Sequence, residues 1–176
     1  EGYFSNGKYT FPVYNQYRGP WVNEPFWDGY FPKEACNICA CATILSGLLS
    51  TMILPTDVKK KAYEYYGYGT YITHDEGQTI INNLPLMMEL FGANVSNSDG
   101  TISQAKEHLI SGRPVEVNVK GYYGAGTTGS GHLIAFLAYD QNKNQVFIGD
   151  PAGRSGSGWY NWSDANATAS WYILAG

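Results

Sequence analysis

The sequence predicts an α+β fold, with helices in the first two thirds of the chain and strands in the last third. Apolar residues recur at helical spacing in several segments before residue 112, and they alternate with a period of two after Pro114. A hydrophobic content of 44% against 15% charged residues argues against gross disorder. Because 176 residues can bury a proper core, we expect residues 1–176 to form a single domain.

The strongest helical pattern begins at Cys36 and extends to about Ser50. Its small and apolar residues recur at helical spacing and form a largely buried stripe: Cys39, Ala40, Thr43, Ile44, Gly47 and Leu48. Three further helices are expected at residues 54–67, 83–92 and 101–112. Thr56 is the expected cap of the first, and Thr101 with Gln104 has the spacing of a capping box in the last.

The first 35 residues are irregular and aromatic, and one short strand is expected there over residues 13–17. After Pro114 the period-two pattern predicts strands at residues 115–119, 132–140, 145–150, 157–162 and 169–176. Since helices come first and strands later, these strands are expected to form an antiparallel sheet.

Charge and hydropathy exclude several classes of partner. The net charge is −4 and no Lys/Arg cluster is longer than residues 59–61, which argues against nucleic acid. The longest apolar run, at residues 44–54, is too short and too interrupted to span a membrane. With 15 tyrosines, 21 glycines and little charge, the composition favours a secreted or cell-surface protein whose signal segment has been removed, and we expect a monomer.

The three cysteines, Cys36, Cys39 and Cys41, fall within six residues. An odd, clustered set is a poor disulfide framework. Metal binding is not expected either, because no second Cys/His cluster would complete a tetrahedral site.

A histidine and an aspartate are predicted to meet at the open end of a hairpin. If residues 140–144 form its turn, the strands pair residues whose numbers sum to about 284. His132 then lies opposite a position near 152, one pair step from Asp150. Both numbers are even, so a register with an even sum places the two side chains on one face; a bulge would break this register.

This pair has two interpretations. The carboxylate could hold one ring nitrogen of an acid/base histidine and leave the other nitrogen to work. Alternatively, His132 is a strand-end residue and Asp150 with Pro151 simply starts a turn.

A histidine base needs a nucleophile and an oxyanion donor. Cys36 opens a predicted helix, where the macrodipole favours a thiolate, although a small core residue is an equal alternative. Cys39 and Cys41 lie deeper in the helix and are expected in the core. Gln16 could donate its amide to an oxyanion together with the Cys36 backbone N–H, or form ordinary loop hydrogen bonds.

An aromatic cluster and a glycine-rich segment also have two interpretations each. The aromatic cluster Trp21, Phe26, Trp27 and Tyr30 either lines a substrate cleft or packs the loop before Cys36. The glycine-rich segment 121–131 is either a flap beside the site or a long connection. His74 and His108 match no motif; neither is expected to be catalytic, and His108 is expected on the surface of its helix.

Taken together, the order of these residues resembles the C39-like group of papain-superfamily cysteine peptidases. That family shows a "V-x-Y-x-Q" strand, an aromatic "P-W" stretch and a helix beginning "G-C-G-P"; the chain reads "VYNQYRGPWVNEPFW" and "ACNICACATILSGLL". The later segments "DEGQTIINNLPLMMELFGANV", "GRPVEVNV", "GTTGSGHLIAFLAYD" and "FIGDPAG" are also similar to the family pattern. The resemblance covers residues 13–153, and the step from cysteine to the "S-G" glycine fits Cys36 rather than Cys39 or Cys41.

The resemblance implies a papain-like fold, in which an N-terminal helical part carries the nucleophile helix against the antiparallel sheet. It implies a thiol hydrolase without a cofactor, in which Cys36 attacks a carbonyl, His132 moves the proton, Asp150 orients His132 and Gln16 binds the oxyanion. The substrate implied is a peptide or a cell-wall-type amide.

Residues expected to contact this substrate are Trp21, Trp27, Asn37 and Gly131. The turn after the nucleophile departs from the family pattern, since "A-C-N-I" replaces "G-C-G-P". Three functions therefore remain open: a peptidase or amidase, a non-catalytic peptide-binding domain with the same fold, and an acyltransferase or transpeptidase in which an amine replaces water.

Overall fold

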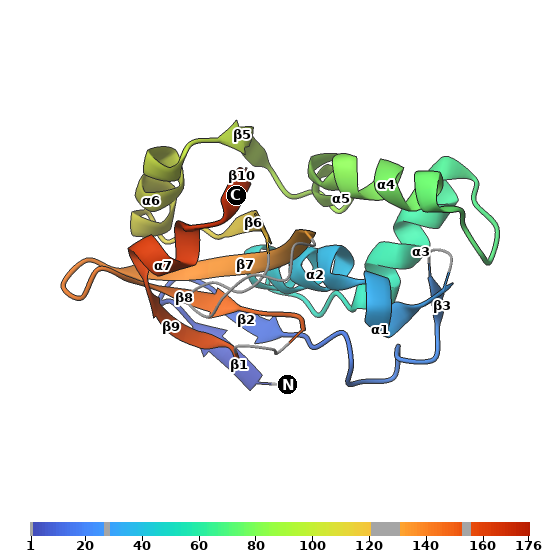
Figure 1. The fold of residues 1–176 in the computed structure, drawn as a ribbon, viewed down its shortest axis with the longest axis horizontal. Helices are drawn as coiled ribbons and strands as arrows, with labels where there is room; N and C mark the ends of the chain where they lie inside the picture. Colours follow the sequence, from blue (N-terminus) through green and yellow to red (C-terminus); the bar gives the residue numbers. More distant parts are fainter. Residues whose placement is uncertain (1, 27–28, 121–130, 153–155) are drawn as a thin grey trace.

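A six-stranded antiparallel sheet forms the centre of the computed structural model, which describes residues 2–26, 29–120, 131–152 and 156–176 (Figure 1). In spatial order its strands are β5 (Val95–Gly100), β10 (Ala169–Ala175), β6 (Val115–Lys120), β7 (Gly131–Asp140), β8 (Gln145–Gly149) and β9 (Gly158–Asn161). Two small sheets pair β1 (Gly2–Ser5) with β2 (Thr10–Val13) and β3 (Pro25–Phe26) with β4 (Gly29–Tyr30).

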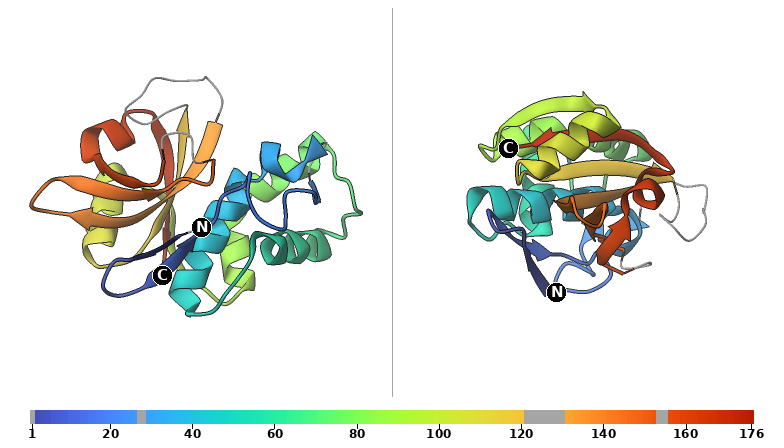
Figure 2. Two further views of the ribbon diagram at one scale, coloured as in Figure 1. Left: turned by 90° about the horizontal axis from the view of Figure 1, so that it is seen from below. Right: turned by 90° about the vertical axis from the view of Figure 1, so that its left-hand side faces the viewer.

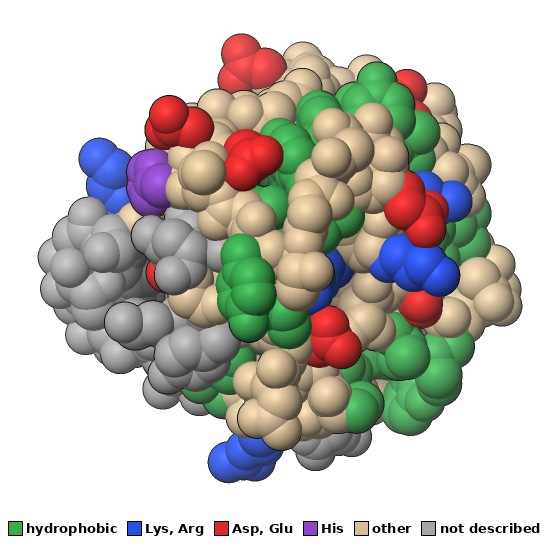
Figure 3. All heavy atoms as spheres, turned by 90° about the vertical axis from the view of Figure 1, so that its right-hand side faces the viewer, with side chains coloured by type: hydrophobic (Ala, Val, Ile, Leu, Met, Phe, Trp, Pro, Cys, Tyr) green, Lys and Arg blue, Asp and Glu red, His purple; other side chains and the backbone are tan. Residues whose placement is uncertain are grey.

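The helices lie on both faces of this sheet. They are α1 (Phe31–Glu34), α2 (Cys36–Leu49), α3 (Pro55–Tyr66), α4 (His74–Asn82), α5 (Leu84–Leu90), α6 (Ile102–Ile110) and α7 (Trp162–Asn166). Seen from below, α2 to α5 gather on one side of the sheet, and α6 and α7 cover the other side (Figure 2). Charges of both signs are mixed with apolar side chains on the face that α3 and α4 form (Figure 3).

Helix α2 is the most deeply buried helix, because every residue from Asn37 to Gly47 is buried. One face of β7 packs on it through Leu133, Ala135 and Leu137. The small residues of the predicted stripe allow close approach on another side, where a Cβ on Gly47 would lie 2.1 Å from the ring of Phe11. The predicted packing of the helix that begins at Cys36 on an antiparallel sheet is therefore confirmed.

The opposite face of the sheet has its own core. Ile134 and Phe136 of β7 and their neighbours on β6 and β8 pack there beneath Ala105 and Leu109 of α6 and Trp162 of α7. Successive residues of β7 thus alternate between two cores, as the period-two pattern predicts. Both faces of this strand are buried from Leu133 to Leu137, so its central part lies between the two cores.

Several local predictions need correction. The expected strand at 13–17 is wrong, because β2 ends at Val13 and its pairing with β1 lies earlier in the chain. The expected cap Thr56 is also wrong: Pro55 is the first helical residue, and the Leu54 N–H donates to the Asp57 carboxylate at 2.8 Å. Pro55 suits this position because its missing N–H would have no helical partner.

His108 is buried rather than on the helix surface, and its Nε2 is 2.6 Å from the carbonyl oxygen of Ala175. It lies on the same side of α6 as Ala105 and Leu109, the side that faces the sheet. Burial lowers the pKa of His108, so the ring is held neutral against the last strand. None of the helices in the described part of the chain has the length and hydrophobicity that a membrane span requires.

Candidate active site

The hairpin of β7 and β8 brings His132 and Asp150 together. At its open end the register pairs Ala135 with Gly149 and Phe136 with Ile148, as predicted. An irregularity follows between Phe136 and Ala138, toward the turn, and leaves the open end in the predicted register. His132 Nε2 lies 2.7 Å from Asp150 Oδ1.

Local contacts fix the Asp150 carboxylate in front of the imidazole. Its Oδ1 also accepts the Ala152 N–H at 2.9 Å, and the Asp150 N–H donates to Ser157 Oγ at 3.0 Å. The Asp150 side chain is 2% exposed and the His132 side chain 13%. Since an ionised carboxylate only accepts, Nε2 of His132 carries the proton and Nδ1 is left for another partner.

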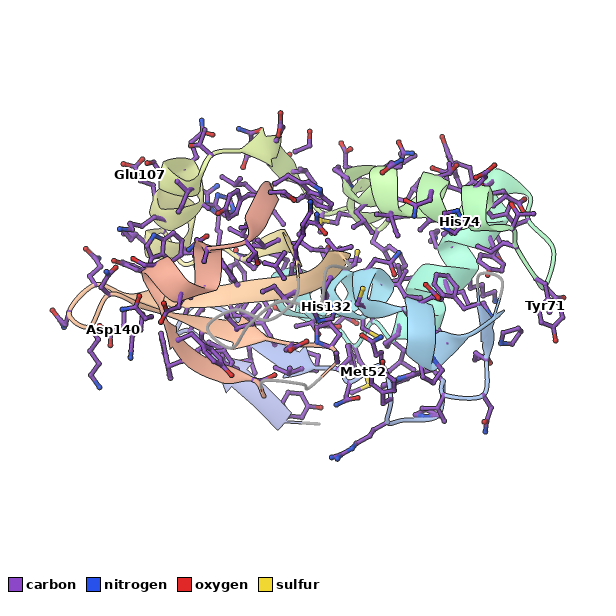
Figure 4. The ribbon with its side chains drawn as sticks, viewed as in Figure 1. Met52, Tyr71, His74, Glu107, His132 and Asp140 are labelled. Carbon is purple, nitrogen blue, oxygen red and sulfur yellow. The ribbon has the colours of Figure 1, made fainter. Side chains whose placement is uncertain are left out.

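Cys36 lies close enough to this ring to raise the pKa of His132, which makes its thiol the candidate partner of Nδ1. Cys36 is half-buried at the first position of α2, and no acidic side chain lies in the first turn of that helix. In Figure 4 His132 lies at the start of β7, beside the N-terminal end of α2. The positive end of the helix dipole therefore points toward the sulfur.

The pKa of His132 is raised to about 10. Burial alone would lower it, but the hydrogen bond with Asp150, the neighbouring Cys36 side chain and the charge of both groups outweigh that effect. The imidazolium form is thus favoured in this site at neutral pH. An imidazolium beside a thiol at a helix N-terminus is the arrangement that stabilises a thiolate.

Gln16 bridges the two sides of the site. Its side-chain amide nitrogen donates to the Pro32 carbonyl at 2.8 Å, just before α2, and its backbone N–H donates to the Pro151 carbonyl at 2.7 Å. Its side chain is buried, and Oε1 has no hydrogen-bond partner among the described residues. The structure thus gathers Gln16, Cys36, His132 and Asp150 at one place, while their catalytic roles stay predictions.

The four residues expected to contact substrate lie in different environments. Gly131 is exposed beside the cavity that contains Cys36. Trp21 is 4% exposed, packs between Tyr14 and Phe31, and donates from Nε1 to the Asn15 carbonyl. Asn37 is fully buried. Trp27 and the segment 121–130 lie outside the described residues.

A cavity of about 390 Å³ opens beside Cys36. Its walls come from α1, through Glu34, from α4, through His74, Gln78, Ile81 and Asn82, and from the sheet, through Asn118, Leu133 and Trp171. The sheet residues form one row across three strands, because Asn118 of β6 pairs with Leu133 of β7 and with Trp171 of β10. Asn118 and Trp171 were not predicted as site residues from the sequence, and only the alternation of their strands could have indicated their common face.

A buried carboxyl group near α2 was also not predicted from the sequence. Glu116 is fully buried, and neither of its carboxyl oxygens has a hydrogen-bond partner among the described residues. Burial raises its pKa well above the usual value, and the charge of Cys36 adds to the effect. The pattern "VEVNV" is typical of a strand with one solvated face, but the Glu116 face lies toward the core under α2, with Ala135 and Ile173 as its strand partners.

Comparisons with known proteins agree with this architecture. The sequence model of the peptidase C39-like family matches residues 8–176. Xylellain, a cysteine protease from Xylella fastidiosa, superposes with a TM-score of 0.51 at 11% identity, covering 94% of this chain and 86% of that one. A protein assigned as a C39-like peptidase from Bacillus anthracis gives a TM-score of 0.49 at 12% identity, covering 80% of this chain and 88% of that one. No curated protein gave a significant sequence match.

Proposed function

Because the chain belongs to the peptidase C39-like family, we propose that it hydrolyses a peptide or cell-wall-type amide bond through an acyl-enzyme on Cys36. One observation carries this proposal: His132 Nε2 lies 2.7 Å from the Asp150 carboxylate, and Cys36, the first residue of α2, is close enough to the same ring to raise its pKa. This is the arrangement of a nucleophile, a base and an orienting carboxylate.

In the first half of the reaction the Cys36 thiolate attacks the substrate carbonyl carbon. The carbonyl π pair moves onto oxygen, and the Gln16 amide and the Cys36 backbone N–H stabilise that oxyanion. The C–N bond then breaks, and the departing amine takes the proton of the His132 imidazolium. A thioester on Cys36 and a neutral His132 remain.

In the second half neutral His132 removes a proton from water, and the resulting hydroxide attacks the thioester. Collapse of the second tetrahedral intermediate breaks the C–S bond and restores the thiolate and the imidazolium. Asp150 keeps the proton on Nε2 throughout. Nδ1 is therefore the nitrogen that gives a proton to the departing amine and takes one from water.

The thiol itself provides the first test. Iodoacetamide at mildly acidic pH should modify Cys36 stoichiometrically, because an ordinary thiol is protonated there while an ion-paired thiolate is not. Cys39 and Cys41 serve as internal controls, because both are fully buried and burial raises the pKa of each well above its usual value. Peptide mapping that finds Cys36 unmodified would contradict the ion pair.

Product analysis then separates the remaining functions. Incubation with a peptide mixture, with and without an added amine, should give free carboxylates in both cases if water is the acceptor. Amide products that appear only with the amine would indicate acyl transfer. A reactive Cys36 with neither product would indicate a peptide-binding domain.

A further inference from the structure

A second cavity of about 510 Å³ adjoins the cavity beside Cys36. The two share Ile81 and Asn82 of α4 and Trp171 of β10. A substrate segment that reaches the thiol can therefore pass over Trp171 into this second space. Cavities of this size are typical of sites that enclose small ligands or short peptide segments.

The register of the sheet explains the direction of this groove. Trp171 lies in the row with Asn118 and Leu133 on the floor of the first cavity, and Ile173, two residues further along β10, lines the second. Successive residues on one face of a strand are about 7 Å apart, so a bound chain that follows β10 advances about two residues between them. Leu86 of α5 and Ser98 of β5 form the walls at the far end.

The charged residues of the second cavity are both acidic. Glu89 comes from α5 and Asp99 from β5, and both are exposed. Neither carboxylate forms an ion pair with a described residue, and no Lys or Arg is among the described residues that line either cavity. Two uncompensated carboxylates from separate elements give this end of the groove a negative potential.

From this arrangement we infer that the groove selects peptides with a cationic side chain, lysine or arginine, a few residues from the scissile bond, and that Glu89 and Asp99 bind its charge. This inference rests on the proposed function, because it takes Cys36 as the reacting end of the groove. Asn82 and Ser98 provide polar contacts for the peptide backbone, and Trp171 and Leu86 cover the apolar stem of the side chain. An acidic side chain at the same position is rejected by like charge.

The test uses short unstructured peptides that differ by Lys, Gln or Glu at one scanned position. The wild type should cleave the Lys members fastest, and Glu89→Gln with Asp99→Asn should reduce the Lys-over-Gln preference in kcat/KM by about fivefold, as expected for two solvent-exposed charge contacts. Glu107→Gln with Asp164→Asn changes the net charge equally on α6 and α7. Glu107 lies at the opposite end of the molecule from His74, which borders the first cavity, so this control should keep the preference (Figure 4).

Binding to the Cys36→Ala variant separates this inference from catalysis. A preference of that variant for Lys peptides that is lost on adding Glu89→Gln and Asp99→Asn supports the inference even without turnover by the wild type. Equal cleavage and equal binding of the Lys and Gln peptides at every scanned position would overturn the inferred cationic preference. That result would leave the hydrolase proposal intact. Iodoacetamide labelling of Cys36 in the Glu89→Gln, Asp99→Asn variant confirms that its site is assembled.

Discussion

Replacing Asp150 with Asn should change how stability depends on pH. In the folded protein the pKa of His132 is raised from 6.5 to about 10. A histidine with a raised folded pKa keeps its proton over a range where the unfolded chain has lost it. Its contribution is therefore complete below about pH 6.5 and is lost as the pH rises to about 10.

The size of this contribution follows from the shift. A difference of about 3.5 pKa units corresponds to about 5 kcal/mol at low pH, and it decreases by about 1.4 kcal/mol for each pH unit in the window. Asp150 and Cys36 share this contribution, because both side chains raise the pKa of His132 and Asp150 is hydrogen-bonded to its ring. Asp150→Asn should thus be several kcal/mol less stable near neutral pH, and the deficit should shrink as the pH approaches about 10.

The assay is urea denaturation of the wild type and Asp150→Asn across this pH range, with the difference in unfolding free energy taken at each pH. Groups that titrate equally in both proteins cancel in that difference. Asp164→Asn, an exposed residue on α7, matches the change of charge and should show no such trend. Cys36→Ser should remove only part of the slope. A deficit of Asp150→Asn that stays constant over this pH range would refute the reasoning.

Two further substitutions test the packing and the buried charge around α2. Gly47→Ala should lower the unfolding free energy by about 1–3 kcal/mol in urea denaturation, because the new Cβ would lie 2.1 Å from the Phe11 ring; Gly69→Ala, with open space around it, should not. Glu116→Gln should gain stability over the wild type as the pH rises above 4.5, since the unfolded wild type ionises there while burial holds the folded carboxyl neutral. The same pH series measures this gain, and a Glu116→Gln deficit that grows with pH would show that the carboxyl is ionised and stabilised in the fold.

The register of the hairpin could be predicted because a short polar turn between two strands leaves few pairings. The pairing at the open end, Ala135 with Gly149, follows from the residue numbers, and the irregularity after Phe136 lies on the turn side of it. The helix at Cys36 could be predicted for a similar reason, because its apolar and small residues persist through many turns. Local periodicity was sufficient for these elements.

Features that depend on what covers a surface could not be predicted in this way. The alternation of β6 correctly separates Glu116 from its valine neighbours, but only the position of α2 decides that both faces are buried. The role of Trp21 was open for the same reason, and it packs against Tyr14 and Phe31. Helix α4 was missed although Thr73 and Glu76 form a capping box at its start, because the segment is short and contains Gly77.

The departure from the family pattern after Cys36 is best understood from burial. Asn37 and Ile38 are both fully buried, whereas Cys36 keeps partial exposure and borders the cavity. The two larger side chains therefore turn into the protein and leave access to the sulfur open. Burying Asn37 instead lowers the free energy of unfolding, because neither polar atom of its side chain has a hydrogen-bond partner among the described residues.

Asn37→Leu tests this explanation. Leucine has a similar size and no polar atoms to desolvate, so the variant should be more stable by about 1–3 kcal/mol in urea denaturation. Alkylation of Cys36 at mildly acidic pH should be unchanged, because the Asn37 side chain is buried away from solvent. Asn37→Asp is the matched control, because it keeps the size of the side chain and places a charge at the same buried position. This variant should be strongly destabilised. A stable Asn37→Leu protein with a slower Cys36 reaction would instead show that the asparagine amide acts on the thiol.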